Sequence, residues 1–234
     1  MAIRALTFDA AGTLIEVAEP VGATYARIAG RHGIAVAPAE VDRRFRAAMS
    51  AAPPLAFADI SAVGLRARER EWWRAVVRGA LGAPTNLAAF DRCFDELFEH
   101  YAGAAAWRVF PDVAQTLGAL RTRGFAVAVV SNFDSRLEPL LADLGIGRLA
   151  DHVLVSSRVG YAKPDPTIFR VACTTLGIPM RSAVHVGDSV ALDVVGALAA
   201  GVGAVLVDRD GRRPVLPEGT RAITSLAELL PLHP

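Results

Sequence analysis

The stretch IRALTFDAAGT, residues 3–13, decides the fold. Residues 3–8 are mostly apolar and predict a buried β-strand. The strand is followed at once by the carboxylate of Asp9 and, three residues later, by Gly12. In an open α/β sheet, ligands bind beyond the carboxyl ends of the strands. Other strands of the same sheet should therefore bring their own C-terminal residues to this edge.

Four further apolar runs predict strands, and helical patterns lie between them. The predicted strands cover residues 125–130, 153–155, 183–186 and 204–207, and the helices lie near 112–123, 136–144, 166–176 and 191–200. These helices close on Gly124, Gly145, Gly177 and Gly201, as helix ends often do. Alternating strands and helices are typical of a parallel sheet with helices on both faces. The predicted fold class is therefore α/β, with a Rossmann-like parallel sheet core.

Residues 16–105 interrupt this alternation. They have helical periodicity and proline punctuation, and no convincing strand. We expect an all-helical cap domain, residues 16–105, inserted after the first strand into a core made of residues 1–15 and 106–234. Within the cap, arginines recur every fourth residue from Arg66 to Arg78. This spacing predicts a solvated helix face, balanced by Glu69 and Glu71.

Composition excludes several classes of protein. The chain has 234 residues and a formal net charge of +1, which gives no reason to expect nucleic acid or an anionic membrane as a partner. The chain has no apolar run of about 18 residues without a charged side chain, so we do not expect a membrane protein. The start of the chain resembles no signal peptide, so we expect a cytoplasmic protein. Cys93 and Cys173 fit no metal or redox spacing and are expected to be reduced and buried.

Four segments carry charged or hydroxyl side chains at strand ends or helix starts. They are Asp9 to Thr13, Ser131 to Asp134, Lys163 to Pro166, and Gly187 to Ser189 with Asp193 one helical turn later. Lys163 is also the single lysine of a chain that has 25 Lys and Arg residues, so the other 24 are arginines. A compact ammonium group is retained at a position where the planar guanidinium would be too wide.

These side chains suggest a chemistry. Asp9 and Asp188 at neighbouring strand ends would repel each other unless a cation lies between them, and Mg2+ suits such carboxylate oxygens. A phosphoryl group could be held by Ser131, by Lys163 and by backbone N–H groups around Gly12 and Asn132. The Asp9 carboxylate could then attack the phosphorus and form an aspartyl-phosphate.

In order and strand context, the four segments resemble the four motifs of the haloacid dehalogenase superfamily, in its type with a helical cap after the first motif. The resemblance covers essentially the whole chain. The stretches PVGATYARIAGRHGI, from residue 20, and VVSNFDSRLEPLL, from residue 129, are similar to the subgroup typified by the rhythmically expressed gene two product. The resemblance implies that Asp9, the backbone carbonyl of Ala11, and Asp188 are metal ligands. It further implies supporting roles for Thr13, whose hydroxyl would bond within the loop, and for Asp193.

One position departs from the family. Phosphatases of the superfamily usually carry a second Asp two residues after the nucleophile, where this chain has Ala11. General acid–base help is worth about 100- to 10,000-fold, so its loss should slow the turnover of alkyl phosphates. Glu16 or a cap histidine could supply the proton instead.

The predicted function is a hydrolase, a Mg2+-dependent phosphatase of a small phosphorylated metabolite with weakened general acid–base chemistry. One alternative is a phosphate-binding or phospho-accepting regulatory module with little turnover. Another is a 2-haloacid dehalogenase, which the retained Asp188 disfavours. The sequence predicts neither the substrate nor the oligomeric state.

Overall fold

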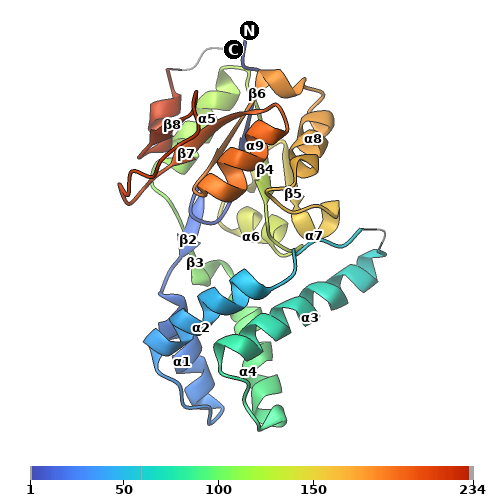
Figure 1. The fold of residues 1–234 in the computed structure, drawn as a ribbon, viewed down its shortest axis with the longest axis vertical. Coiled ribbons are helices and arrows are strands. Elements are labelled where there is room, and N and C mark those ends of the chain that lie inside the picture. Colours follow the sequence, from blue (N-terminus) through green and yellow to red (C-terminus); the bar gives the residue numbers. More distant parts are fainter. Residues whose placement is uncertain (1, 59, 232–234) are drawn as a thin grey trace. The chain divides into compact units, whose positions relative to one another are not determined.

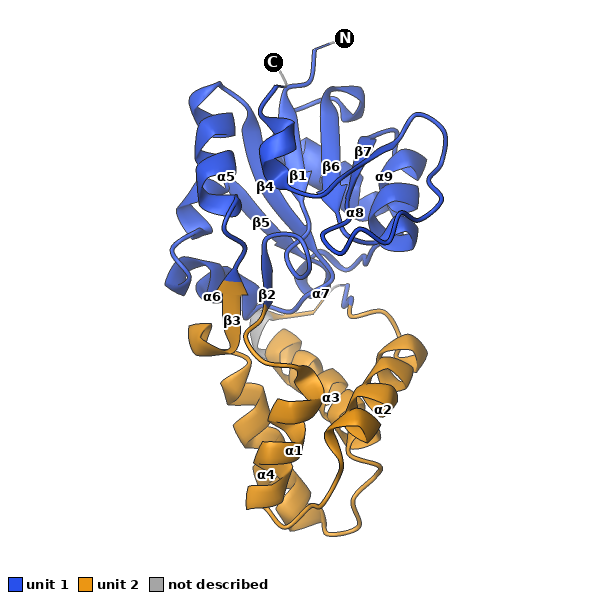
Figure 2. Cartoon of the chain, turned by 90° about the vertical axis from the view of Figure 1, so that its left-hand side faces the viewer, with its two compact units in different colours: residues 1–16, 56–59, 109–234 blue, residues 17–55, 60–108 orange. Residues whose placement is uncertain are grey.

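A computed structural model describes residues 2–58 and 60–231. The chain divides into two compact units, which Figure 2 colours separately. Unit 1 consists of Met1–Glu16, Ala56–Asp59 and Val109–Pro234, and unit 2 consists of Val17–Leu55 and Ile60–Arg108. A short segment from the middle of the predicted insertion, Ala56–Asp59, therefore groups with unit 1.

Unit 1 is built on a six-stranded sheet (Figure 1). Its strands, in the order β5-β4-β1-β6-β7-β8, are β5 (His152–Val155), β4 (Ala126–Ser131), β1 (Ala5–Phe8), β6 (Ala183–Gly187), β7 (Gly203–Val207) and β8 (Arg221–Ile223). All the pairs are parallel. Because β1 lies between β4 and β6, the strand order reverses at β1, and a crevice at such a switch point is where α/β sheets bind ligands.

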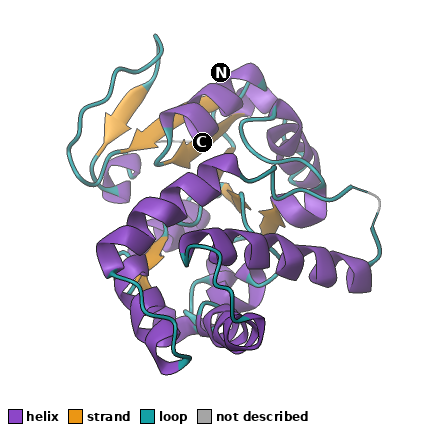
Figure 3. Cartoon of the chain, turned by 60° about the horizontal axis from the view of Figure 1, so that its bottom comes forward, coloured by secondary structure: helices purple, strands orange, loops and turns teal. Residues whose placement is uncertain are grey.

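Helices cover both faces of this sheet (Figure 2). Figure 3 draws the helices in purple and the strands in orange. The helices of unit 1 are α5 (Val113–Thr122), α6 (Leu137–Asp143), α7 (Ser156–Val159), α8 (Pro166–Thr175) and α9 (Val195–Ala199), with short 3-10 or π turns η2 (Gly147–Leu149), η3 (Met180–Ser182), η4 (Val190–Val194) and η5 (Leu226–Leu229). On one face, α8 and α9 pack against small β-strand residues such as Ala5, Ala128 and Ala183. Figure 2 shows α5 on the opposite face.

The predicted Rossmann-like α/β core is confirmed, with strand ends shifted by one or two residues. Two details differ from the prediction. Strand β8 was not predicted, because only Ile223 of its three residues is buried and no apolar run marks it. The helix predicted at 191–200 begins instead with the π turn η4, which is followed by α9.

Unit 2 contains four helices, α1 (Val21–Arg31), α2 (Pro38–Ala51), α3 (Ala62–Ala80) and α4 (Leu87–His100), and the turn η1 (Ala104–Ala106). Their shared core includes Tyr25, Ile28, Phe90 and Phe94. Two short strands, β2 (Ile15–Val17) and β3 (Trp107–Val109), pair with each other at the ends of the helical segment. Neither strand was predicted from the sequence.

The arginine face of α3 differs from the prediction. Arg70 and Arg74 form ion pairs with Asp95 and Asp91 of α4, rather than with acidic neighbours on their own helix. Their guanidinium groups also lie over phenylalanine rings of α4, with Arg70 4.9 Å from the centroid of Phe94. These arginines therefore link α3 to α4, and cation–π contact adds to the ion pairs.

Candidate active site

Three strands of unit 1 bring functional side chains to one edge of the sheet. Asp9 follows β1, Ser131 ends β4, and Asp188 follows β6. The parallel register pairs Phe8 with residues of both neighbouring strands, and the Asp9 N–H continues this pairing with a 2.9 Å hydrogen bond to the Val186 carbonyl. The ladder thus fixes the backbone of Asp9, and its side chain is buried to all but 11%.

The Lys163 ammonium group lies between two carboxylates. Its Nζ is 2.7 Å from Asp9 Oδ1 and 2.5 Å from Asp193 Oδ1, and 2% of the side chain is exposed. Burial alone would lower the pKa of Lys163, but the adjacent carboxylates of Asp9 and Asp193 outweigh it and raise this pKa. The lysine is therefore held as a cation against the Asp9 carboxylate.

Asn132 fixes the backbone of this lysine. The Asn132 Oδ1 accepts a 2.7 Å hydrogen bond from the Lys163 N–H, and its Nδ2 donates a 2.8 Å hydrogen bond to the Lys163 carbonyl. The backbone N–H of Asn132 was predicted to help hold a phosphoryl group. The side chain of Asn132 therefore holds the Lys163 peptide, and a contact of its backbone N–H with a phosphoryl group stays a prediction.

Asp193 is the centre of a buried hydrogen-bond network. Besides Lys163, its Oδ1 contacts His185 Nε2 at 3.1 Å, and its Oδ2 accepts a 2.9 Å hydrogen bond from the Ser189 N–H. Burial opposes ionisation of Asp193, but Lys163 and His185 outweigh burial and lower its pKa below the ordinary range. Asp193 is thus an ionised support that orients the lysine.

His185 was not predicted to belong to the site. It lies in β6 with 1% of the residue exposed, and its Nδ1 is 2.9 Å from Thr7 Oγ1. A carboxylate can only accept, so the His185 Nε2 carries the hydrogen that Asp193 binds. Burial lowers the pKa of His185, so Nδ1 is bare and the Thr7 hydroxyl donates to it. A polar pair in two otherwise apolar buried strands was the available signal in the sequence.

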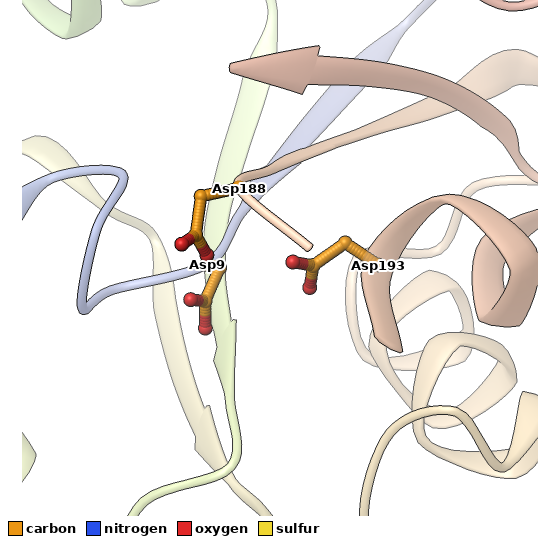
Figure 4. Close-up of side chains that lie close together, drawn as sticks. All are labelled: Asp9, Asp188 and Asp193. Atoms are coloured by element: carbon orange, nitrogen blue, oxygen red, sulfur yellow. The ribbon is translucent and has the colours of Figure 1, made fainter. Parts of the chain in front are cut away.

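Asp188 faces the other two carboxylates (Figure 4). Oxygen atoms of Asp9, Asp188 and Asp193 all lie within 4.8 Å of one another. Burial, with the nearby charges of Asp9 and Asp193, raises the pKa of Asp188 to about 6. Three carboxylates and one ammonium group leave two negative charges when all are ionised. This cluster fits a divalent cation, and the hard oxygen donors suit Mg2+.

The loop after β1 packs directly on Asp188. Gly12 has a positive φ of 87°, and a Cβ atom on it would lie 2.5 Å from Asp188 Oδ2, so only glycine fits. The loop is closed by hydrogen bonds from the Leu14 and Ile15 N–H groups to the Ala10 carbonyl, at 2.8 and 3.0 Å. Its position therefore affects the surroundings of Asp188 directly.

Two further predicted residues lie in this loop. The side chain of Ala11 is exposed and carries no group that could transfer a proton. Thr13 is fully buried, but its hydroxyl has no hydrogen-bond partner within the described residues. The expectation that this hydroxyl bonds within the loop was therefore wrong, because the loop is closed by backbone groups instead.

A parallel α/β sheet with an acidic cluster and a buried lysine at its switch point defines an α/β enzyme class with its ligand site at the strand ends. The model of the haloacid dehalogenase-like hydrolase family matches residues 3–201. The chain belongs to this family, and it is a hydrolase.

Similar proteins agree with this assignment. The chain is 38% identical to the haloacid dehalogenase-like hydrolase domain-containing protein 3 of Mus musculus, over 88% of this chain and 82% of that protein. It is 33% identical to a phosphoserine phosphatase of Thermus thermophilus, over 78% of this chain and 79% of that protein. The crystal structure of a HAD phosphatase from Thermococcus onnurineus is 26% identical, with a TM-score of 0.67 and coverage of 97% of this chain and 96% of that chain.

Within residues 2–58 and 60–231, no helix combines the length and the apolar character needed to cross a membrane.

Proposed function

We propose that the chain is a Mg2+-dependent phosphatase of a small phosphorylated metabolite and that Asp9 is its nucleophile. One observation carries the proposal. The Asp9 carboxylate is paired with a buried ammonium group at 2.7 Å and lies beside a second carboxylate, Asp188, whose pKa is raised to about 6. A perturbed acidic cluster around one buried cation is a characteristic of catalytic sites rather than of a solvated strand end.

Each group has a role in this proposal. An Asp9 oxygen attacks phosphorus, the bond from phosphorus to the leaving oxygen breaks, and that oxygen keeps the electron pair. Water then attacks phosphorus, and the bond from phosphorus to the Asp9 oxygen breaks, which restores the Asp9 carboxylate. One proton of the water stays on the released phosphate, and the other reaches the leaving oxygen through solvent. Lys163 and the Ser131 hydroxyl offset the phosphoryl charge. The Gly12 N–H, which was predicted to help hold the phosphoryl group, instead donates a 2.8 Å hydrogen bond to the Ile15 carbonyl within the loop.

Mg2+ would be held by Asp9, Asp188 and the Ala11 carbonyl. When bound, it would neutralise charge on the carboxylates and on the phosphate oxygens. Asp193 would take part by orienting Lys163, with which it already pairs at 2.5 Å.

Ala11 determines which substrates turn over well. The methyl group of Ala11 cannot protonate a leaving oxygen, so a phosphate ester with an acidic leaving group, such as an aryl phosphate, is favoured over an alkyl ester. The same absence favours the second candidate function, a phospho-accepting module, because the aspartyl-phosphate would also lack a base to activate water.

The chain also contains a segment that could select the substrate. We infer that the helices of unit 2 act as a cap domain.

We also infer that the reaction takes place in the cytoplasm. The two cysteines, both free and buried, are compatible with a reducing compartment.

The test is an aryl phosphatase assay with Mg2+ on wild type, Asp9→Asn and the control Asp143→Asn, which changes an exposed residue at the end of α6. We expect turnover in wild type and in the control, and none in Asp9→Asn. Equal turnover in Asp9→Asn would reject Asp9 as the nucleophile. A single stoichiometric release of phenol, without further turnover, would support the phospho-accepting module instead.

A further inference from the structure

Arg209 connects the end of the sheet to the loop after Asp9. It lies two residues beyond the end of β7, and its Nη2 donates a 2.6 Å hydrogen bond to the Thr13 carbonyl. The guanidinium carbon lies 3.7 Å from the centroid of the Phe110 ring. Only 16% of the Arg209 side chain is exposed. This arginine is therefore enclosed between an aromatic face and the loop that follows the proposed nucleophile.

Asp112 holds the guanidinium group in this orientation. Its two carboxylate oxygens accept hydrogen bonds from Nη1 and Nη2 of Arg209, each at 3.2 Å. The same carboxylate accepts a 2.8 Å hydrogen bond from the Ser225 hydroxyl and a 2.7 Å hydrogen bond from the Leu226 N–H. Burial alone would raise the pKa of Asp112, but these donors outweigh it and lower this pKa. Asp112 is therefore an ionised, fully engaged partner.

The contact of Arg209 with Thr13 is connected to the acidic cluster through Gly12, the residue before Thr13. Because the Thr13 hydroxyl has no partner in the described part of the chain, the hydrogen bonds of this residue are made by its backbone, and its carbonyl is the group held by Arg209. The neighbouring residue, Gly12, packs so closely on Asp188 that a Cβ atom would overlap its carboxylate. Because Gly12 is bonded directly to Thr13, a movement of the Thr13 backbone would also move the Gly12 backbone, which packs on Asp188.

We propose that Arg209 is a positioning residue, which holds the loop of residues 10–15 against Asp188 through the Thr13 carbonyl. The expected effect of Arg209 on catalysis rests on the proposed function. The expected effect of Arg209 on the loop does not depend on the proposed function. A lysine could not replace the arginine fully, because one ammonium group cannot present a planar fork to Asp112 and reach the Thr13 carbonyl while stacking on Phe110. Arg209 does not touch the reacting atoms and acts through the loop alone.

The experiment compares Arg209→Gln with a matched control, Arg121→Gln. Arg121 also joins a carboxylate, Asp151 at 3.0 Å, to a backbone carbonyl, that of Arg148 at 3.0 Å, but it does not contact the loop. Amide hydrogen exchange is measured without metal or substrate for the N–H groups of residues 12–15 and of β4. We expect exchange in the loop to accelerate by about tenfold or more in Arg209→Gln, while β4 is unchanged, because a hydrogen bond from a charged donor is lost. Arg121→Gln should leave the loop at its wild-type rate.

Two further measurements separate positioning from general stabilisation. In Arg209→Ala, a low, non-denaturing concentration of methylguanidinium should restore slow exchange in the loop. In the aryl phosphatase assay, Arg209→Gln should lower kcat, and methylguanidinium should restore the kcat of Arg209→Ala.

Unchanged loop exchange in Arg209→Gln, or equal acceleration in the loop and in β4, would overturn the proposal. If the loop responds as expected while wild type has no phosphatase activity, the proposed function fails and the positioning role stands.

Discussion

Replacing Asp188 with Asn should stabilise the metal-free protein while removing metal binding. The pKa of Asp188 is raised from 3.8 to about 6 by burial and by Asp9 and Asp193. The folded protein therefore binds this proton more tightly than the unfolded chain does, and wild type loses stability as the pH rises from about 4 through 6. A shift of about two pKa units corresponds to about 3 kcal/mol, and asparagine carries no charge to be penalised.

This free-energy difference should vary with pH, and urea unfolding in EDTA can measure it at each pH. The free energy of unfolding of Asp188→Asn should exceed that of wild type by about 1.5 kcal/mol at pH 5 and by about 3 kcal/mol at pH 7, where the difference levels off. The control Asp143→Asn makes the same substitution at an exposed residue outside the acidic cluster. Added Mg2+ should then stabilise wild type but not Asp188→Asn, by about 2.7 kcal/mol at 100 times the Kd.

Two results would refute this reasoning. A difference between Asp188→Asn and wild type that stays constant from pH 5 to pH 8 would mean that Asp188 is not penalised by its neighbours. Equal stabilisation of both proteins by Mg2+ would mean that the metal binds elsewhere.

Three further predictions concern the residues around Asp9. Ala11→Asp should raise kcat/KM for alkyl phosphates by up to about 100- to 10,000-fold and change aryl phosphates less, because it restores a proton donor; equal gains for both esters would contradict this. Lys163→Arg should lower the aryl phosphatase rate by at least about 100-fold in steady-state assays, since a guanidinium is too wide for this buried position; near-normal turnover would contradict it. His185→Leu should lower kcat more than His185→Gln, whose amide can still donate to Asp193, and equal rates would argue against that hydrogen bond.

The sequence predicts those parts of the site that follow strands of the core. Asp9 and Asp188 immediately follow apolar runs, and Lys163 stands out as the one lysine, so motif order and strand context were enough to select them. The parallel sheet was predictable for the same reason, because its buried strands are short apolar runs between helices.

The supporting contacts could not be predicted in this way. Arg209 and Thr13 are 196 residues apart in the chain, and His185 and Thr7 are 178 apart. Nothing local marks these pairs, because each depends on which strands become neighbours in the sheet. Asn132 shows the same limit, since its position after β4 was predicted, whereas the engagement of its side chain with the Lys163 backbone was not.

The most direct test of the central proposal is to trap the covalent intermediate. Wild type and Asp9→Asn are mixed with Mg2+ and excess aryl phosphate, quenched in acid, digested and analysed by mass spectrometry. We predict a peptide that gains the mass of one phosphoryl group at Asp9 in wild type, and no such peptide in Asp9→Asn. Turnover without any phosphorylated peptide, or with the group on another residue, would contradict the account.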